Sequence, residues 1–127
     1  MHEKQIENLG ALSSKDRYEH FLSKVCDWEE LWILENEEGH FLIVCPDPEN
    51  EYIPVWPHSE YAKLFGEDYP SCKPEKLDLS AFIEKWLPGL ANDEIKVGVL
   101  PNLETTVWII NPLELKAELE AELSQYE

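Results

Sequence analysis

The short stretch from Trp56 to Ser59 contains the residue types in this chain that are best suited to chemistry. His58 can act as an acid or a base, because an imidazole titrates near neutral pH. Trp56 offers a large contact area, and Ser59 can cap a following helix. Trp56, His58 and Ser59 are therefore candidates for a small-molecule pocket, with Cys72 as a candidate nucleophile beside His58. The interpretation that we favour is a structural joint between a strand and a helix.

Motifs that would define an enzyme are missing from the sequence. It has no glycine-rich phosphate loop and no GxSxG, HExxH or EF-hand motif. The three cysteines, Cys26, Cys45 and Cys72, form no CxxC pair, and their odd number is typical of reduced thiols. We therefore favour a non-enzymatic protein that holds neither a metal ion nor a cofactor, and the alternative is a small-molecule-binding or enzymatic domain with a pocket between Trp56 and His58.

Negative charge is concentrated in one part of the chain. With 10 basic and 27 acidic residues, the formal net charge is −17, and no Lys or Arg lies between Asp27 and Glu51. Such a block can be a solvated face that keeps an exposed sheet soluble. Alternatively, it can be a docking surface that attracts a basic protein. The residues that we expect in this surface are Glu29, Glu30, Glu35, Glu37 and Glu38.

The composition also argues against several partner classes. A protein this acidic is repelled by the phosphate backbone of nucleic acids. The chain has no run of about eighteen apolar residues that would cross a membrane, and its start lacks a secretory signal. We therefore expect a cytoplasmic protein that binds neither nucleic acid nor membranes. A homodimer stays open, because Trp32 and Trp108 lie in runs that are apolar on both faces.

Four amphipathic helices are predicted from apolar residues at helical spacing and from capping signals. The first follows a serine cap at position 13 or 14, and the second has Ser59 as its N-cap. Pro88 and Gly89 are expected to end the third helix. Asn111 followed by Pro112 is the strongest helix start in the sequence. The segments concerned are 13–28, 59–66, 77–90 and the residues from 112 onwards.

Five strands are predicted from short runs of apolar and β-branched residues. Three of them form a β-meander and two form a hairpin. Pro54 cannot donate a ladder hydrogen bond, so its strand should be short, bulged or at an edge. The expected strands are Leu31–Leu34, Phe41–Cys45, Tyr52–Trp56, Ile95–Val99 and Thr105–Ile110.

The expected order of elements, α-βββ-α-α-ββ-α, is typical of an α+β fold. We predict an antiparallel or mixed sheet of about five strands packed against about four helices. Residues 1–12 should be a loosely ordered N-terminal segment, and residues 13–127 should form a single domain.

Several segments resemble a bacterial family that is known only as domain of unknown function 2750. The likeness spans Tyr18 to Leu123 and is carried by YEHFLSKVCDWEELWILENEEG, IPVWPHSEYAKL, FIEKWLPGLANDEIKVGVLPNL and the helix after Asn111. This resemblance implies no activity. The strand and helix start in IPVWPHSEYA are also similar to the N-terminal domain of the secretion enhancer SseB. That likeness implies a protein-binding module with an immunity-like or regulatory role.

Overall fold

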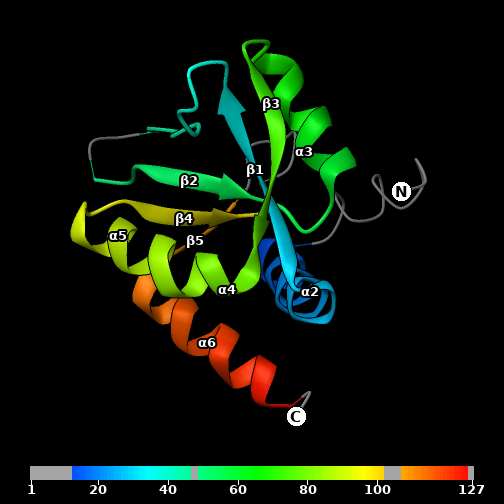
Figure 1. The fold of residues 1–127 in the computed structure, drawn as a ribbon, viewed down its shortest axis with the longest axis vertical. Coiled ribbons are helices and arrows are strands. Elements are labelled where there is room, and N and C mark those ends of the chain that lie inside the picture. Colours follow the sequence, from blue (N-terminus) through cyan, green and yellow to red (C-terminus); the bar gives the residue numbers. More distant parts are fainter. Residues whose placement is uncertain (1–12, 47–48, 102–106, 126–127) are drawn as a thin grey trace.

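The computed structural model describes residues 13–46, 49–101 and 107–125 (Figure 1). Its helices are α2 (Ser14–Trp28), α3 (Ser59–Phe65), α4 (Leu79–Ala81), α5 (Leu87–Asn92) and α6 (Pro112–Ser124). Its strands are β1 (Glu30–Asn36), β2 (Tyr52–Val55), β3 (Cys72–Asp78), β4 (Lys96–Val99) and β5 (Trp108–Ile110). A 3-10 turn, Gly66–Asp68, follows α3, and a π-helical turn, Phe82–Trp86, joins α4 to α5. These elements confirm the predicted α+β class.

The strands form two small sheets that touch each other. β2 runs parallel to β4, β4 runs antiparallel to β5, and β1 pairs with β3 in a separate antiparallel ladder. The sheets meet where the backbones of Trp32 and Trp56 exchange hydrogen bonds of 2.7 and 3.0 Å. Pro54 lies opposite Gly98 in the short edge strand β2, as predicted. The expectation of a loosely ordered segment at 1–12 concerns residues outside the described ranges.

The segment 41–45 is not the regular strand that the sequence predicts. Its bridges to neighbouring strands are isolated ones, from Phe41 to Glu35 and from Val44 to Tyr52. Glu35 belongs to β1 and Tyr52 belongs to β2. Because each end of the segment pairs with a different strand, no continuous ladder forms along it.

The fifth strand is β3, which the sequence analysis does not predict. It pairs with β1 along seven residues. Its sequence, CKPEKLD, contains four charged residues and a proline, and its side chains are exposed or half-buried. A polar strand of this kind suits the border of a sheet, where charged side chains discourage further pairing. Pairing with β1, rather than any apolar pattern of its own, accounts for this strand.

The third predicted helix continues past Pro88 and Gly89 and ends at Asn92, so the expected stop is wrong. The π-helical turn provides the physical reason. Its last hydrogen bond runs from the Leu87 amide to the Phe82 carbonyl. Pro88 then lies in the first turn of α5, where a missing N–H leaves no bond unmade.

Two of the predicted helix caps are present and one is not. Ser13 Oγ accepts a hydrogen bond from the Asp16 amide at 3.1 Å, and Asn111 Oδ1 accepts one from the Leu113 amide at 3.3 Å. Ser59 is the first residue of α3 rather than its cap. The Ser59 hydroxyl donates to the neighbouring glutamate carboxylate at 3.2 Å.

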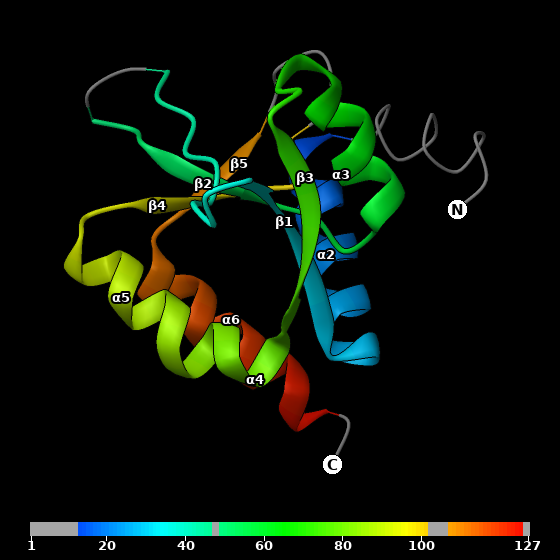
Figure 2. The ribbon, with the colours of Figure 1, turned by 45° about the horizontal axis from the view of Figure 1, so that its top comes forward.

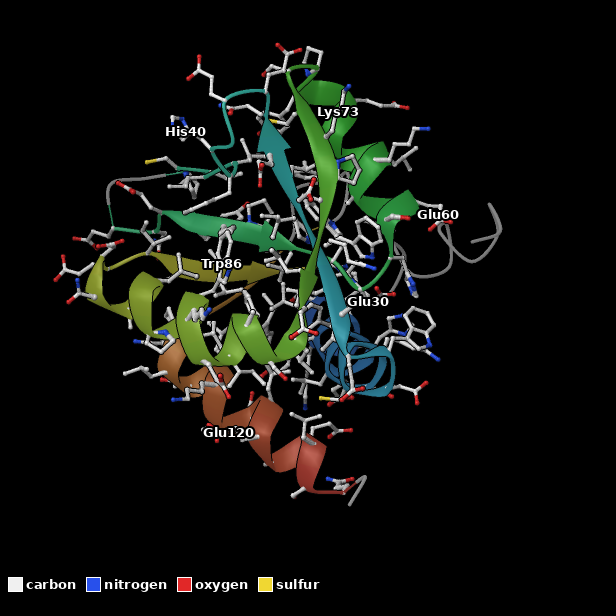
Figure 3. The ribbon with its side chains drawn as sticks, in the orientation of Figure 1. Glu30, His40, Glu60, Lys73, Trp86 and Glu120 are labelled. Atoms are coloured by element: carbon white, nitrogen blue, oxygen red, sulfur yellow. The ribbon has the colours of Figure 1, made fainter. Side chains whose placement is uncertain are left out.

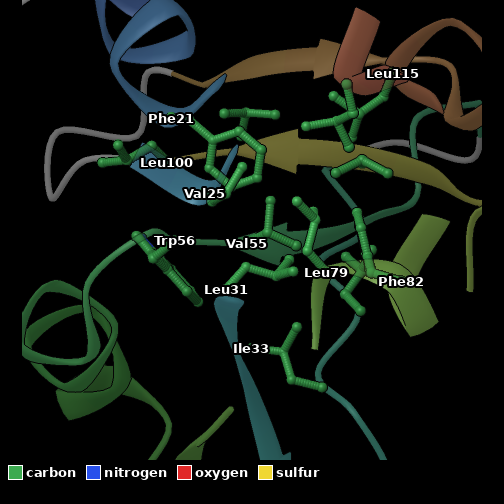
Figure 4. Packing of buried hydrophobic residues seen from close by; sticks show 14 of the residues in the cluster. Phe21, Val25, Leu31, Ile33, Val55, Trp56, Leu79, Phe82, Leu100 and Leu115 are labelled. Carbon is green, nitrogen blue, oxygen red and sulfur yellow. The ribbon is translucent and has the colours of Figure 1, made fainter. Parts of the chain in front are cut away.

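The core lies between α2, the strands and the helical stretch α4–α5, with α6 packed against α5 and α2 (Figure 2). Trp56 has no exposed surface. This burial agrees with the interpretation of the stretch around Trp56 as a structural joint between a strand and a helix. Other core side chains are Phe21, Val25, Leu31, Ile33, Val55, Leu79, Phe82, Leu100 and Leu115 (Figure 4).

A buried arginine fixes the carboxyl ends of the two parallel strands. Arg17 has no exposed surface, and its Nε donates to the Leu100 carbonyl at 2.9 Å. Leu100 directly follows β4 and has a φ of 47°, which is uncommon for a leucine. Trp56 Nε1 donates to the Pro101 carbonyl at 3.4 Å. These contacts hold the start of α2 against the ends of β2 and β4, next to His58.

Candidate functional site

Two histidines meet where β2 is followed by α3. His58 precedes α3, and His20 lies on α2. Their Nε2 atoms are 3.1 Å apart, and their ring centroids are 5.3 Å apart. One ring must donate its Nε2 hydrogen to the other, because two lone pairs or two N–H groups would repel at this distance. The fold therefore brings together two imidazoles that are 38 residues apart in the sequence.

Two further side chains of α2 flank this pair. The rings of Trp28 and His58 meet edge to face with their centroids 5.0 Å apart, and 46% of Trp28 is exposed. Lys24 Nζ lies 5.6 Å from the centre of the Trp28 ring, which is within the range of a cation–π contact. His20, Lys24 and Trp28 follow one another at four-residue spacing on one helix face. We call these three residues and His58 the histidine corner.

The histidine corner favours uncharged imidazoles. Burial, and then the nearby His20 ring, lower the pKa of His58 from 6.5 to about 4. Burial, followed by the charge of Lys24, also lowers the pKa of His20. Both rings are therefore neutral at pH 7. In this state an imidazole can accept a proton or bind a transition metal.

The three residues of the predicted small-molecule pocket have different surroundings. Trp56 packs in the core against Phe65, with ring centroids 5.1 Å apart, and offers no surface to a ligand. His58 is half-buried in the histidine corner, and Ser59 bonds to a neighbouring carboxylate. Cys72 lies in β3, opposite Asn36 of β1. A small-molecule pocket at this corner stays a prediction. Of Trp56 and His58, only His58 reaches the surface there.

The predicted acidic surface is divided between the two ends of β1. Glu29 caps the end of α2, and Glu30 begins β1 (Figure 3). Glu35, Glu37 and Glu38 lie at the end of β1 and in the following turn. The strand separates Glu30 from Glu35 by roughly 16 Å and directs them to opposite faces. The five residues therefore belong to two separate acidic groups.

Lysines on β3 compensate part of this charge. Lys73 lies opposite Glu35 in the ladder, and Lys76 Nζ is 3.6 Å from Glu30 Oε2. An exposed ion pair adds little stability, but it reduces the local negative charge. The segment from Asp27 to Glu51 contains no Lys or Arg, but the folded protein places lysines of β3 beside its acidic residues.

A groove that the sequence analysis does not predict lies between α5 and the segment after β1. It has a volume of about 270 Å³ and is lined by Phe41, Lys85, Trp86, Gly89, Leu90 and Asp93. The rings of Phe41 and Trp86 meet with centroids 5.2 Å apart, and Figure 3 shows Trp86 on the helical stretch that forms one wall. We call this hollow the Phe41–Trp86 groove.

Gly89 is the residue that keeps the groove open. A Cβ atom at this position would meet no other atom within 4 Å. The sequence carries a signal for this groove, because a glycine one turn after Trp86 leaves space on that helix face. The interpretation of Gly89 as a helix stop does not predict the groove.

A second hollow lies at the far end of β1 and is smaller and more polar. Its volume is about 130 Å³, and its lining residues are Glu35, Asn36, Glu37, Ser71, Lys73 and Glu75. Acidic and basic side chains both line this hollow, and none of its lining residues is aromatic or aliphatic. The Phe41–Trp86 groove is therefore the better candidate for holding a partner side chain.

The chain is thus an acidic α+β domain with an aromatic groove and a histidine corner. The model of a family described as protein of unknown function (DUF2750) matches residues 18–119. The chain belongs to this family, which confirms the resemblance seen in the sequence. No curated protein matches the chain, and the likeness to SseB stays a prediction. In the described ranges, no helix is long and apolar enough to cross a membrane.

Proposed function

We propose that this domain is a non-enzymatic protein-interaction module that binds a basic segment of another protein. The observation that carries the proposal is the Phe41–Trp86 groove, which adds an apolar anchor point to an acidic molecule. One apolar side chain of the partner enters the groove, and flanking Lys or Arg residues face carboxylates. This role is compatible with an immunity-like or regulatory protein.

The size of the groove favours a side chain over a whole small molecule. Pockets that enclose a ligand usually have volumes of about 300–1,000 Å³, whereas this groove has about 270 Å³. A single aliphatic or aromatic side chain would contact Phe41, Trp86 and Leu90 together. Buried anchors of this kind supply most of the binding energy at protein interfaces.

Charge favours a basic partner. The chain has a net charge of −17. Lys85 and Asp93 both lie in the wall of the groove, so the negative field comes from the surrounding surface, including Glu35, whose backbone pairs with that of Phe41. A negative field of this kind accelerates the encounter with a basic segment and selects it over acidic competitors. Binding should therefore weaken as salt is added.

Gly89 allows a test that separates binding from folding. Glycine is a poor helix former, and a Cβ atom at position 89 meets no neighbouring atom within 4 Å. Gly89→Leu should fill the groove and leave the fold at least as stable as the parent. Gly89→Ala is the matched control, because it improves the helix but leaves most of the groove empty.

The probe is a short labelled peptide that places one leucine between lysines and arginines, and fluorescence anisotropy measures its binding. We expect the parent and Gly89→Ala to bind it, and Gly89→Leu to bind roughly tenfold or more weakly. A peptide with serine in place of the leucine should lose affinity for the parent. Equal affinity of the peptide for the parent and for Gly89→Leu would contradict the proposal.

The acidic contribution has its own test. Changing Glu35, Glu37 and Glu38 together to lysine should weaken peptide binding and flatten its dependence on salt. Leu113→Ala, which truncates an exposed apolar side chain of α6 outside the groove, is the control and should bind as the parent does. If the triple variant keeps the affinity and salt dependence of the parent, these glutamates are not part of the interface.

A further inference from the structure

We propose that the histidine corner binds a divalent transition-metal ion such as Zn²⁺, with His20 and His58 as its two protein ligands. The proposal does not depend on the Phe41–Trp86 groove. The sequence contains no metal motif, because these two histidines are brought together only by the packing of α2 against the end of β2. It therefore revises the expectation that the protein holds no metal.

The separation of the two nitrogens fits a shared ion. With metal–nitrogen distances of about 2.0–2.1 Å, two ligand nitrogens lie about 2.9 Å apart at an octahedral angle and about 3.4 Å apart at a tetrahedral angle. The observed separation of His20 Nε2 and His58 Nε2 is 3.1 Å. The ring centroids are 5.3 Å apart, so the nitrogens nearly face each other, as a hydrogen bond between them requires. An ion on the line between the two nitrogens would be too close to both for metal–nitrogen bonds of about 2.0–2.1 Å, so it must lie to one side of that line. Each half-buried ring has to turn by about 40° to direct its lone pair at such an ion.

The hydrogen shared by the two rings has to move before both nitrogens can bind one ion. In the ion-free protein one Nε2 carries a hydrogen that it donates to the other Nε2. Binding requires that this ring move its hydrogen to Nδ1, which is a change of tautomer.

The charges around the corner set the strength of the site. The molecule as a whole attracts cations, with a net charge of −17. Lys24 opposes them locally, because it lies one turn after His20 on α2 and its Nζ is 5.6 Å from the centre of the Trp28 ring, which contacts His58. Glu60, two residues after His58, carries the opposite charge. Removal of the Lys24 charge should therefore tighten binding, an effect that a simple hydrogen bond between the rings does not predict.

The protein supplies two ligands, and water completes the coordination shell. In the part of the chain that the structure describes, no group of three His, Cys, Asp or Glu side chains lies close enough to hold an ion. A site with open positions binds more weakly than a closed structural zinc site. The bound ion would link α2 to the segment before α3, so occupancy should raise the melting temperature by mass action.

Calorimetric titration with Zn²⁺ at about pH 7.5 tests the site. His2 can bind zinc independently, so the parent and all variants in this experiment carry His2→Ala. We expect His20→Ala and His58→Ala each to weaken binding by roughly tenfold or more, and Lys24→Gln to strengthen it. His40→Ala, which removes an exposed histidine of the turn after β1, should bind as the parent does. Circular dichroism verifies that each variant is folded.

Fluorescence provides a second readout. Because the rings of Trp28 and His58 are 5.0 Å apart, Ni²⁺ in the site should quench the emission of Trp28, and Trp28→Phe should remove most of this quenching. Zinc binding that is equal in the parent, His58→Ala and His40→Ala would overturn the proposal. Binding that disappears in His40→Ala would overturn it too. In either case the pair would be a hydrogen bond only.

Discussion

The Trp56 side chain connects the end of β2 to the core, and it is the residue whose loss should cost the most. Trp56→Ala removes a fully buried indole and should lower the free energy of unfolding by roughly 3–5 kcal/mol. His58→Ala should cost less, because this ring is only half-buried. Chemical denaturation of the two variants measures the difference. A Trp56→Ala variant as stable as the parent would show that the ring does not support the core.

Gly98 is required by the aromatic ring that packs over β4. A Cβ atom at this position would lie 2.2 Å from Cδ2 of Tyr52, which is far inside a permitted contact. Gly98→Ala should therefore destabilise the fold by about 1–3 kcal/mol, although alanine is otherwise well tolerated in place of glycine. Urea denaturation measures this cost.

The control for Gly98 is a double-mutant cycle with Tyr52. If the clash is the cause, Gly98→Ala should cost much less in a Tyr52→Leu background, where no ring lies over the strand. Equal costs in both backgrounds would assign the effect to the backbone of β4 instead.

At the scale of elements, the start of α3 differs from that of α6, because the N-cap residue of α3, His58, makes no capping hydrogen bond with its side chain. Asn111→Ala should cost about 1 kcal/mol, because Asn111 Oδ1 accepts the Leu113 amide. Ser59→Ala should cost less than this, since the Ser59 hydroxyl bonds to an exposed carboxylate and caps nothing. Thermal or chemical denaturation of the two variants compares them directly. A larger loss for Ser59→Ala would restore Ser59 as the cap of α3.

The elements that the sequence predicts correctly are those with a local signal. The helix after Asn111 has a cap, a proline and an apolar stripe, and α2 has its serine cap and buried face. β3 has no such signal, because a partner strand forms it and its own sequence is polar. The parallel pairing of β2 with β4 likewise depends on the assembled sheet.

In the candidate sites too, the sequence predicts what depends on neighbouring residues and not what depends on distant ones. The sequence indicates His58 as a chemical group, but its partner His20 lies on a different element, α2. The composition indicates the acidic residues, whereas the lysines that compensate them lie on β3. The sequence predicts a helix stop at Gly89, and only the packing of Phe41 beside Trp86 makes this position part of a groove.

At the scale of the whole molecule, the histidine corner should make stability depend on pH. The pKa of His58 is about 4 in the folded protein and about 6.5 when unfolded, and the pKa of His20 is shifted in the same direction. At pH values between about 4 and about 6.5, the unfolded chain binds more protons than the folded protein does. The contribution is therefore fully present above about pH 6.5 and is lost as the pH falls towards about 4.

Melting temperatures of the parent and of His58→Gln, measured from about pH 7 to about pH 4, test this prediction. The variant is needed because protonation of the many carboxylates also changes stability in this range. The parent should lose more stability than His58→Gln on acidification. Parallel curves would mean that the pair does not contribute to the pH dependence.

The pairing of the strands has a consequence for synthesis of the chain. β1 pairs with β3, and β2 lies between them in the sequence. β2 pairs with β4, and β3 lies between those two, so the two ladders are interleaved along the sequence. No contiguous half of the protein therefore contains all four strands β1, β2, β3 and β4. While the chain emerges from the ribosome, β1 has an unpaired edge until residue 78 has appeared, and β2 waits until residue 99. The polar sequence of the arriving strand β3 then covers that edge with charge, at the point where a growing chain is most exposed to aggregation.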